Sequence, residues 1–141
     1  IVISNDAVHY GTENWSRDLA PYGVDDVGTQ KAVAHDKRLI NEYLTGSLSM
    51  DKVKNFTSET VQENDYKEYK WVWCGRYSVP FGLAFANKLN LLQNKVPLNG
   101  AFLGYQSSID HPLIKVEDLH MGTTAIATQK HWVAYASIKY E

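Results

Sequence analysis

Apolar and polar residues follow two distinct periodicities along this chain, and these periodicities predict helices in the first two-thirds and strands toward the end. Over residues 29–45 the apolar positions recur at steps of three and four, which predicts an amphipathic helix. Thr29 is a candidate N-cap, and Gly46 stands where a C′ glycine would end the helix. This is the longest and clearest helical pattern in the chain.

Two further helices are predicted from their starting residues. Residues 49–56 fit a short helix capped by Ser49. Residues 79–93 fit a longer helix capped by Ser78, with Pro80 in the first turn, where its missing N–H is not needed. The apolar side chains of this longer helix fall on one stripe. They are Phe81, Ala84, Phe85, Leu89 and Leu92, with Lys88 among them.

Strands are predicted where apolar and polar residues alternate or β-branched residues gather. The predicted strands are residues 1–4, 8–10, 69–73, 101–106, 123–128 and 131–140. The last two would form a hairpin joined at Gln129 and Lys130. The last strand would turn Trp132, Ala134, Ala136 and Ile138 to one side. Residues 12–28 read as a long irregular loop, and residues 74–77 as a turn.

Together these elements predict an α+β fold made of one long amphipathic helix and a mostly antiparallel sheet with a C-terminal hairpin. The chain has 141 residues, a usual length for one domain, so residues 1–141 are predicted to form a single globular unit. A chain of this length buries about two-thirds of its unfolded surface, so its core needs no metal or disulfide.

Charge and composition narrow the classes of function. The net charge is −2 and no basic stripe is visible, which argues against nucleic-acid binding. No apolar run is long enough for a transmembrane segment. The start Ile-Val-Ile and the acceptor triplets at Asn14 and Asn55 predict a secreted protein and, in a eukaryotic source, a glycoprotein. The single cysteine, Cys74, leaves a free thiol or a bridge to another chain in an oligomer.

An aromatic run precedes Cys74. If one face of the predicted strand 69–73 is open, its rings form a platform for a glycan, a lipid surface or a partner protein. The same alternation would arise if these rings filled the core. The candidate ligand-binding residues are Tyr69, Trp71, Trp73 and Tyr77.

A second hypothesis pairs Cys74 with His131. A thiol just before a helix has a lowered pKa, because the helix N-terminus favours the thiolate. A histidine at the start of a distant strand could then accept the thiol proton. Cys74 precedes the predicted helix 79–93, and His131 opens the predicted strand 131–140.

The residues around this pair resemble the papain-like cysteine hydrolases in their bacterial peptidase and amidase branches. The matching motifs are Trp73-Cys74-Gly75 with Ser78, and His131-Trp132-Val133, over about a fifth of the chain. The resemblance implies Cys74 as nucleophile and His131 as base for cutting an amide in a peptide or in cell-wall material. The family also has a Gln shortly before the nucleophile, where Glu68 stands, and an Asn or Asp after the histidine. No Asn or Asp follows His131.

A third cluster is Asp110-His111 with Glu117-Asp118 and His120, whose oxygen and imidazole groups are of metal-binding type. Their spacing matches no strict ligand pattern, and Pro112 fits a turn, so no metal or cofactor is predicted.

Two classes of function remain. We favour a secreted, non-catalytic binding or toxin-like module that uses its aromatic surface, because the histidine has no orienting residue after it. The alternative is the thiol hydrolase with Cys74 and His131.

Overall fold

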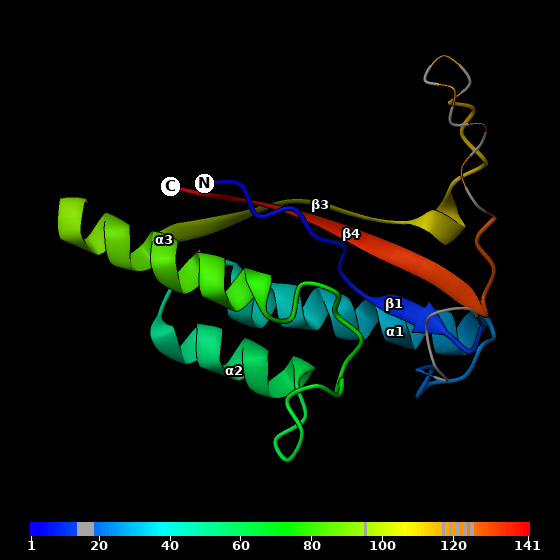
Figure 1. The fold of residues 1–141 in the computed structure, drawn as a ribbon, viewed down its shortest axis with the longest axis horizontal. Coiled ribbons are helices and arrows are strands. Elements are labelled where there is room, and N and C mark those ends of the chain that lie inside the picture. The colour runs from blue at the N-terminus through cyan, green and yellow to red at the C-terminus, as the bar shows by residue number, and fades with distance from the viewer. Residues whose placement is uncertain are drawn as a thin grey trace.

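The computed structural model describes residues 1–13, 19–94, 96–116, 118, 120, 122, 124 and 126–141. Over these residues it confirms the α+β class, with three α-helices packed beneath a four-stranded antiparallel sheet (Figure 1). The helices are α1 (Asp26–Leu39), α2 (Met50–Thr60) and α3 (Ser78–Asn94). The strands are β1 (His9–Gly11), β2 (Gly46–Ser47), β3 (Asn99–Ser107) and β4 (His131–Tyr140).

The first predicted helix is confirmed, but it begins earlier than the sequence indicated. Its N-cap is Asp25, whose carboxylate accepts the Gly28 N–H at 2.7 Å, so the cap lies four residues before Thr29. A carboxylate at this position also stabilises the helix, because its negative charge lies near the positive end of the helix dipole. The helix continues as a π-helical turn, η2 (Ile40–Leu44), and Gly46 follows with φ +69°.

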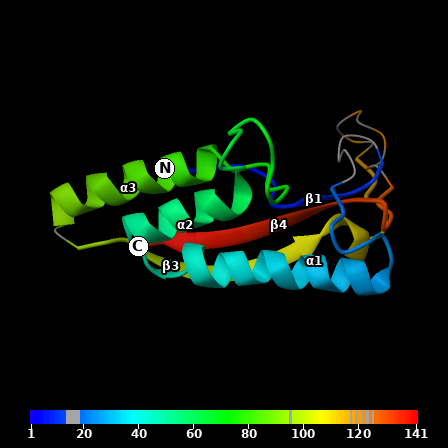
Figure 2. The ribbon, with the colours of Figure 1, turned by 90° about the horizontal axis from the view of Figure 1, so that it is seen from below.

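The other two helices are also confirmed. Ser49 caps α2 by accepting the Lys52 N–H at 3.2 Å, as predicted, and the helix runs four residues past the predicted end. α3 begins at Ser78, and its helical bonding starts even earlier, because Val79 N–H donates to the Gly75 carbonyl at 2.9 Å. Figure 1 shows α1, α2 and α3 below β4, and Figure 2, seen from below, shows β4 running between α3 and α1.

The sheet has the order β1-β4-β3-β2, so β4 is a central strand. Its bounds match the predicted strand 131–140, and it pairs with β3 from Ala134 to Tyr140 and with β1 from His131 to Val133. The predicted hairpin partner, residues 123–128, shows one bridge, between Thr128 and His131. Residues 123 and 125 lie outside the described residues.

Two predicted strands are not present as strands. Residues 69–73 make only isolated bridges, because Trp73 N–H turns back to the Trp71 carbonyl at 2.7 Å and interrupts the extended ladder. Residues 1–4 have no assigned secondary structure and pair with no strand, and Ile1 and Val2 are largely exposed. The resumed strand at 8–10 corresponds to β1.

The core lies between β4 and the helices. Trp132, Tyr10, Phe56, Leu39 and Ile40 are fully buried there. Burying apolar side chains of this size is the main stabilising contribution to such a fold.

The apolar stripe of α3 faces solvent. Phe81 is 75% exposed and Leu92 is 69% exposed, whereas the buried residues of the helix are Leu83 and Asn87. Within the described residues, no helix combines the length and apolar character needed to cross a membrane.

Candidate functional site

The site is positioned by the N-terminal segment, which lies between β4 and the residues before α3. On one side, Ala7 N–H donates to the Ala134 carbonyl at 2.8 Å. On the other side, His9 N–H donates to the Val72 carbonyl at 2.8 Å, and Cys74 N–H donates to the Ala7 carbonyl at 3.0 Å. These bonds bring residues 6–9 against Cys74, which is far away in sequence.

Asp6, His9 and Cys74 meet at this junction. His9 Nε2 lies 3.0 Å from Asp6 Oδ2, and one ligand atom from each of the three side chains lies within 4.8 Å of the others. Among the described residues this is the one such group of three or more histidine, cysteine or acidic side chains. We call these three residues the thiol cluster.

The thiol cluster combines a buried imidazole with an accessible sulfur. His9 is only 7% exposed, Asp6 is half-buried, and Cys74 is exposed. A reagent or substrate can therefore reach the sulfur, while the protein fixes the ring that lies behind it.

Two pKa values in the cluster depart from their ordinary values. Burial raises the pKa of the Cys74 thiol, and the Asp6 carboxylate adds to the rise, although Arg76 opposes it. Burial lowers the pKa of His9 below 6.5, although Asp6 opposes this effect. At neutral pH both groups are therefore uncharged, and the thiol is not a preformed thiolate.

Local structure holds Cys74 immediately before the first turn of α3. A Cβ added at Gly75 would lie 2.8 Å from Val79 Cγ2 and 3.0 Å from Asn5 Cβ, so the close approach of the N-terminal segment requires glycine there. The Cys-Gly pair that the sequence singled out is thus part of the junction itself.

His131, the histidine predicted to pair with Cys74, is not part of the thiol cluster but interacts with one of its members, His9. It opens β4 as predicted, opposite Gly11 in the register with β1, and its charge adds to the lowering of the His9 pKa. The structure therefore brings His131 to His9 and brings His9 to Cys74. Sequence reasoning did not identify Asp6 or His9, although the spacing Asp-x-x-His was present in the sequence.

A cavity of about 600 Å³ opens beside the thiol cluster. Asp6 from the N-terminal segment and His131, Val133 and Tyr135 from β4 line one part of it. The opposite wall is largely apolar and comes from the segment after β3; it includes Leu113, Ile114 and Ile126. A volume of this order and a mostly apolar lining with a few polar groups are typical of small-molecule sites.

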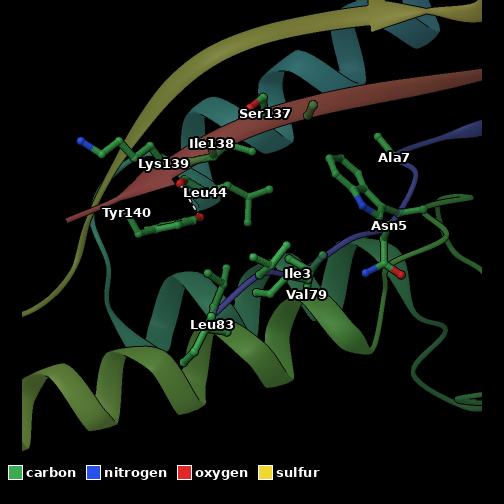
Figure 3. A pocket seen from close by; sticks show the side chains of 14 residues that line it. Ile3, Asn5, Ala7, Leu44, Val79, Leu83, Ser137, Ile138, Lys139 and Tyr140 are labelled. Carbon is green, nitrogen blue, oxygen red and sulfur yellow. Dashed lines mark hydrogen bonds between the residues drawn. The ribbon is translucent and has the colours of Figure 1, made fainter.

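A second cavity, of about 490 Å³, lies on the other side of the N-terminal segment (Figure 3). Asn5 and Ala7 line this cavity, whereas Asp6 lines the first one, as expected for alternate residues of an extended segment. Its walls come mainly from apolar residues of α3 and the end of β4, including Leu83 and Ile138. Neither Cys74 nor His9 lines either of these two cavities.

The predicted aromatic platform is not an open surface. Trp71 is 2% exposed and Trp73 is 3% exposed, so both rings belong to the core. Trp71 stacks on His35 at 4.1 Å, and Trp73 meets Phe56 edge-on at 5.1 Å.

The two tyrosines of the platform lie at the surface beside one arginine. Tyr69 is half-buried and Tyr77 is exposed. The Arg76 guanidinium lies 3.5 Å from the centre of the Tyr69 ring and 4.5 Å from that of Tyr77. One face of Tyr69 is therefore already covered.

The third predicted cluster does not assemble among the described residues. Asp110 accepts a hydrogen bond from Ser107, and His111 contacts Gln106 at 2.7 Å, so each is engaged locally. Glu117, a member of that cluster, lies outside the described residues.

No family model, curated protein or solved structure matches this chain. The function is therefore argued from the geometry of the thiol cluster and the neighbouring cavity.

Proposed function

We propose that this protein is a thiol hydrolase of amides or esters, with Cys74 as nucleophile, His9 as general base and Asp6 as the residue that orients His9. The observation that carries the proposal is the placement of one atom from each side chain within 4.8 Å of the others at the start of α3. The three residue types match the roles of a nucleophile, a base and an orienting carboxylate. This keeps the predicted nucleophile and replaces His131 by His9 as the base.

The proposed reaction has two steps. In the first, a ring nitrogen of His9 accepts the thiol proton as the sulfur attacks the substrate carbonyl carbon, and the leaving amine or alcohol takes that proton as the carbon–nitrogen or carbon–oxygen bond breaks. In the second, His9 accepts a proton from water as the water oxygen attacks the thioester carbon, the carbon–sulfur bond breaks to release the acid, and the leaving thiolate takes the proton back from His9. The Asp6 carboxylate, 3.0 Å from the ring, stabilises the imidazolium formed in each step.

The cavity beside the cluster is the proposed place of the acyl group. Of the three cluster residues only Asp6 lies in its wall, so the substrate carbonyl has to extend past Asp6 to reach the Cys74 sulfur. The apolar residues of the opposite wall favour an acyl group with an apolar side chain or tail.

The test is acylation of Cys74 by a nitrophenyl ester with an apolar acyl chain, followed by intact mass spectrometry. We expect a single acyl group on the wild-type protein and none on Cys74→Ala. For His9→Gln we expect acylation to slow by about 100-fold or more, the usual contribution of a general base. If the wild-type protein is acylated no faster than His9→Gln, the proposal is wrong.

A second candidate function is supported by α3. This helix has 17 residues, its only charged residue is Lys88, and Phe81 and Phe85 are exposed by 75% and 55%. Exposed apolar faces of this kind mark interaction surfaces. The second candidate is therefore the binding module favoured from the sequence. Its aromatic surface is now placed on α3 and not on residues 69–77, and its target is a lipid surface.

Flotation with phosphatidylcholine vesicles tests this second function. We expect the wild-type protein to float with the vesicles and the double variant Phe81→Ser, Phe85→Ser to stay in the soluble fraction. Equal behaviour of the two proteins would contradict it. Secretion, glycosylation and glycan binding stay predictions from the sequence.

A further inference from the structure

The donor atoms of the thiol cluster also suit a metal ion. A cysteine sulfur, a histidine nitrogen and a carboxylate oxygen are the three kinds of ligand that bind Zn²⁺ in proteins. In the thiol cluster one such atom from each residue lies within 4.8 Å of the other two. The sequence predicted no metal site, and none of these three residues belonged to the candidate cluster at residues 110–120.

The His9–Asp6 distance is close to that of a tetrahedral site, and the Cys74 sulfur, within 4.8 Å of both atoms, has to move closer to them by up to about 1.2 Å. With zinc bonds of about 2.0 Å to nitrogen or oxygen and about 2.3 Å to sulfur, nitrogen and oxygen ligands lie about 3.3 Å apart, and sulfur lies about 3.6 Å from either. His9 Nε2 and Asp6 Oδ2 are 3.0 Å apart. An ion between them needs these two atoms to move apart by only a few tenths of an ångström.

The mixture of donors selects the metal. A thiolate and an imidazole favour a borderline or soft ion such as Zn²⁺, whereas Mg²⁺ and Ca²⁺ favour sets made of oxygen alone. Three protein ligands leave one coordination position for water. The exposure of Cys74 and the half-exposure of Asp6 give the ion a path from solvent.

We propose that Asp6, His9 and Cys74 bind one Zn²⁺ ion and that the bound ion prevents Cys74 from acting as a nucleophile. Zinc binding displaces the thiol proton and occupies the sulfur and the ring that the hydrolytic reaction needs. The inhibitory part of this inference rests on the proposed function, whereas the metal binding itself does not.

The experiment is a titration of the metal-free protein with Co²⁺ and then with Zn²⁺. Binding of Co²⁺ is expected to give a thiolate-to-cobalt charge-transfer band at one ion per chain, and Zn²⁺ is expected to remove that band. We expect Cys74→Ser to abolish the band. We expect Asp6→Asn and His9→Gln to weaken binding by at least about tenfold.

His131→Gln and His111→Gln are the matched controls, because both histidines lie beside the neighbouring cavity and outside the thiol cluster. We expect their Co²⁺ and Zn²⁺ affinities to equal that of the wild-type protein. Loss of affinity in His131→Gln as large as in His9→Gln would overturn the assignment. So would a wild-type protein without the charge-transfer band.

A measurement on the wild-type protein alone guards against misfolded variants. Zinc is expected to slow alkylation of Cys74 by iodoacetamide by at least about tenfold, and a chelator is expected to restore the rate. An unchanged rate would contradict the proposal. The nitrophenyl ester test is run with chelator, so a failed hydrolase with an intact cobalt band and a failed metal site with intact acylation are distinguishable outcomes.

Discussion

Asp36 is a fully buried acidic residue, an environment that a carboxylate does not prefer. It is fully buried on α1, where Oδ1 accepts the Trp71 Nε1–H at 2.9 Å and Oδ2 accepts the Tyr105 hydroxyl at 3.0 Å. Burial raises the pKa of its carboxyl group to about 6, against these bonds and one from the Val8 backbone, which lower it. The carboxylate thus connects α1 to three other segments while its charge remains costly to bury.

The raised pKa of Asp36 predicts how the free energy of unfolding depends on pH. Because the folded pKa lies above the ordinary 3.8, protonation favours the folded state. The contribution of Asp36 to the free energy of unfolding is therefore largest below pH 3.8 and falls as pH rises to about 6. A difference of about two pKa units corresponds to about 3 kcal/mol.

Asp36→Asn removes this titration while an amide can still accept from Trp71. We expect the unfolding free energy of the variant, relative to the wild-type protein, to increase by about 3 kcal/mol between pH 3 and pH 7. Urea unfolding at several pH values measures it. A difference that stays constant over this range would show that Asp36 titrates normally.

At the same scale, the sequence allowed only part of the thiol cluster to be predicted. Cys74 was identified because a lone cysteine before a capped helix is a local pattern. Asp6 and His9 were not identified, because their approach to Cys74 depends on pairing between segments far apart in the chain. Local periodicity carries no information about such pairing.

At the scale of elements, helices and long strands were predictable from the periodicity of their apolar residues, whereas short paired segments were not. β4 alternates over ten residues and was predicted with its bounds. Residues 69–73 also alternate aromatic with other residues, yet Trp71, Val72 and Trp73 are all buried. Both sides of this segment are therefore covered. The alternation does not mark an open face, and Trp71 and Trp73 cannot form the predicted surface platform.

The two faces of α3 give a second prediction. Leu83 is 3% exposed and packs in the core, whereas Phe85 is 55% exposed. We expect Leu83→Ala to lower the free energy of unfolding by about 2–4 kcal/mol, because it leaves a cavity. We expect Phe85→Ala to change it by less than about 1 kcal/mol.

Urea unfolding of both variants provides the measurement. The sequence pattern alone favours the opposite order, since Phe85 belongs to the apolar stripe and Leu83 does not. A larger loss for Phe85→Ala than for Leu83→Ala would mean that the stripe is the buried face after all.

At the scale of the whole molecule, the α+β class was predictable because the helical and strand rhythms occupy different parts of the chain. The sequence did not reveal that all three helices cover one side of the sheet (Figure 1). Described residues of the segment after β3 line part of the cavity beside Asp6 and His131. The site lies where the N-terminal segment joins this sheet to the start of α3.

The most direct test of the account compares two histidine variants in the same acylation experiment. The central claim is that His9, and not His131, serves Cys74. We predict that His9→Gln slows acylation of Cys74 by about 100-fold or more and that His131→Gln slows it by less than about tenfold. The reverse order, or equal rates for both variants and the wild-type protein, would contradict the account.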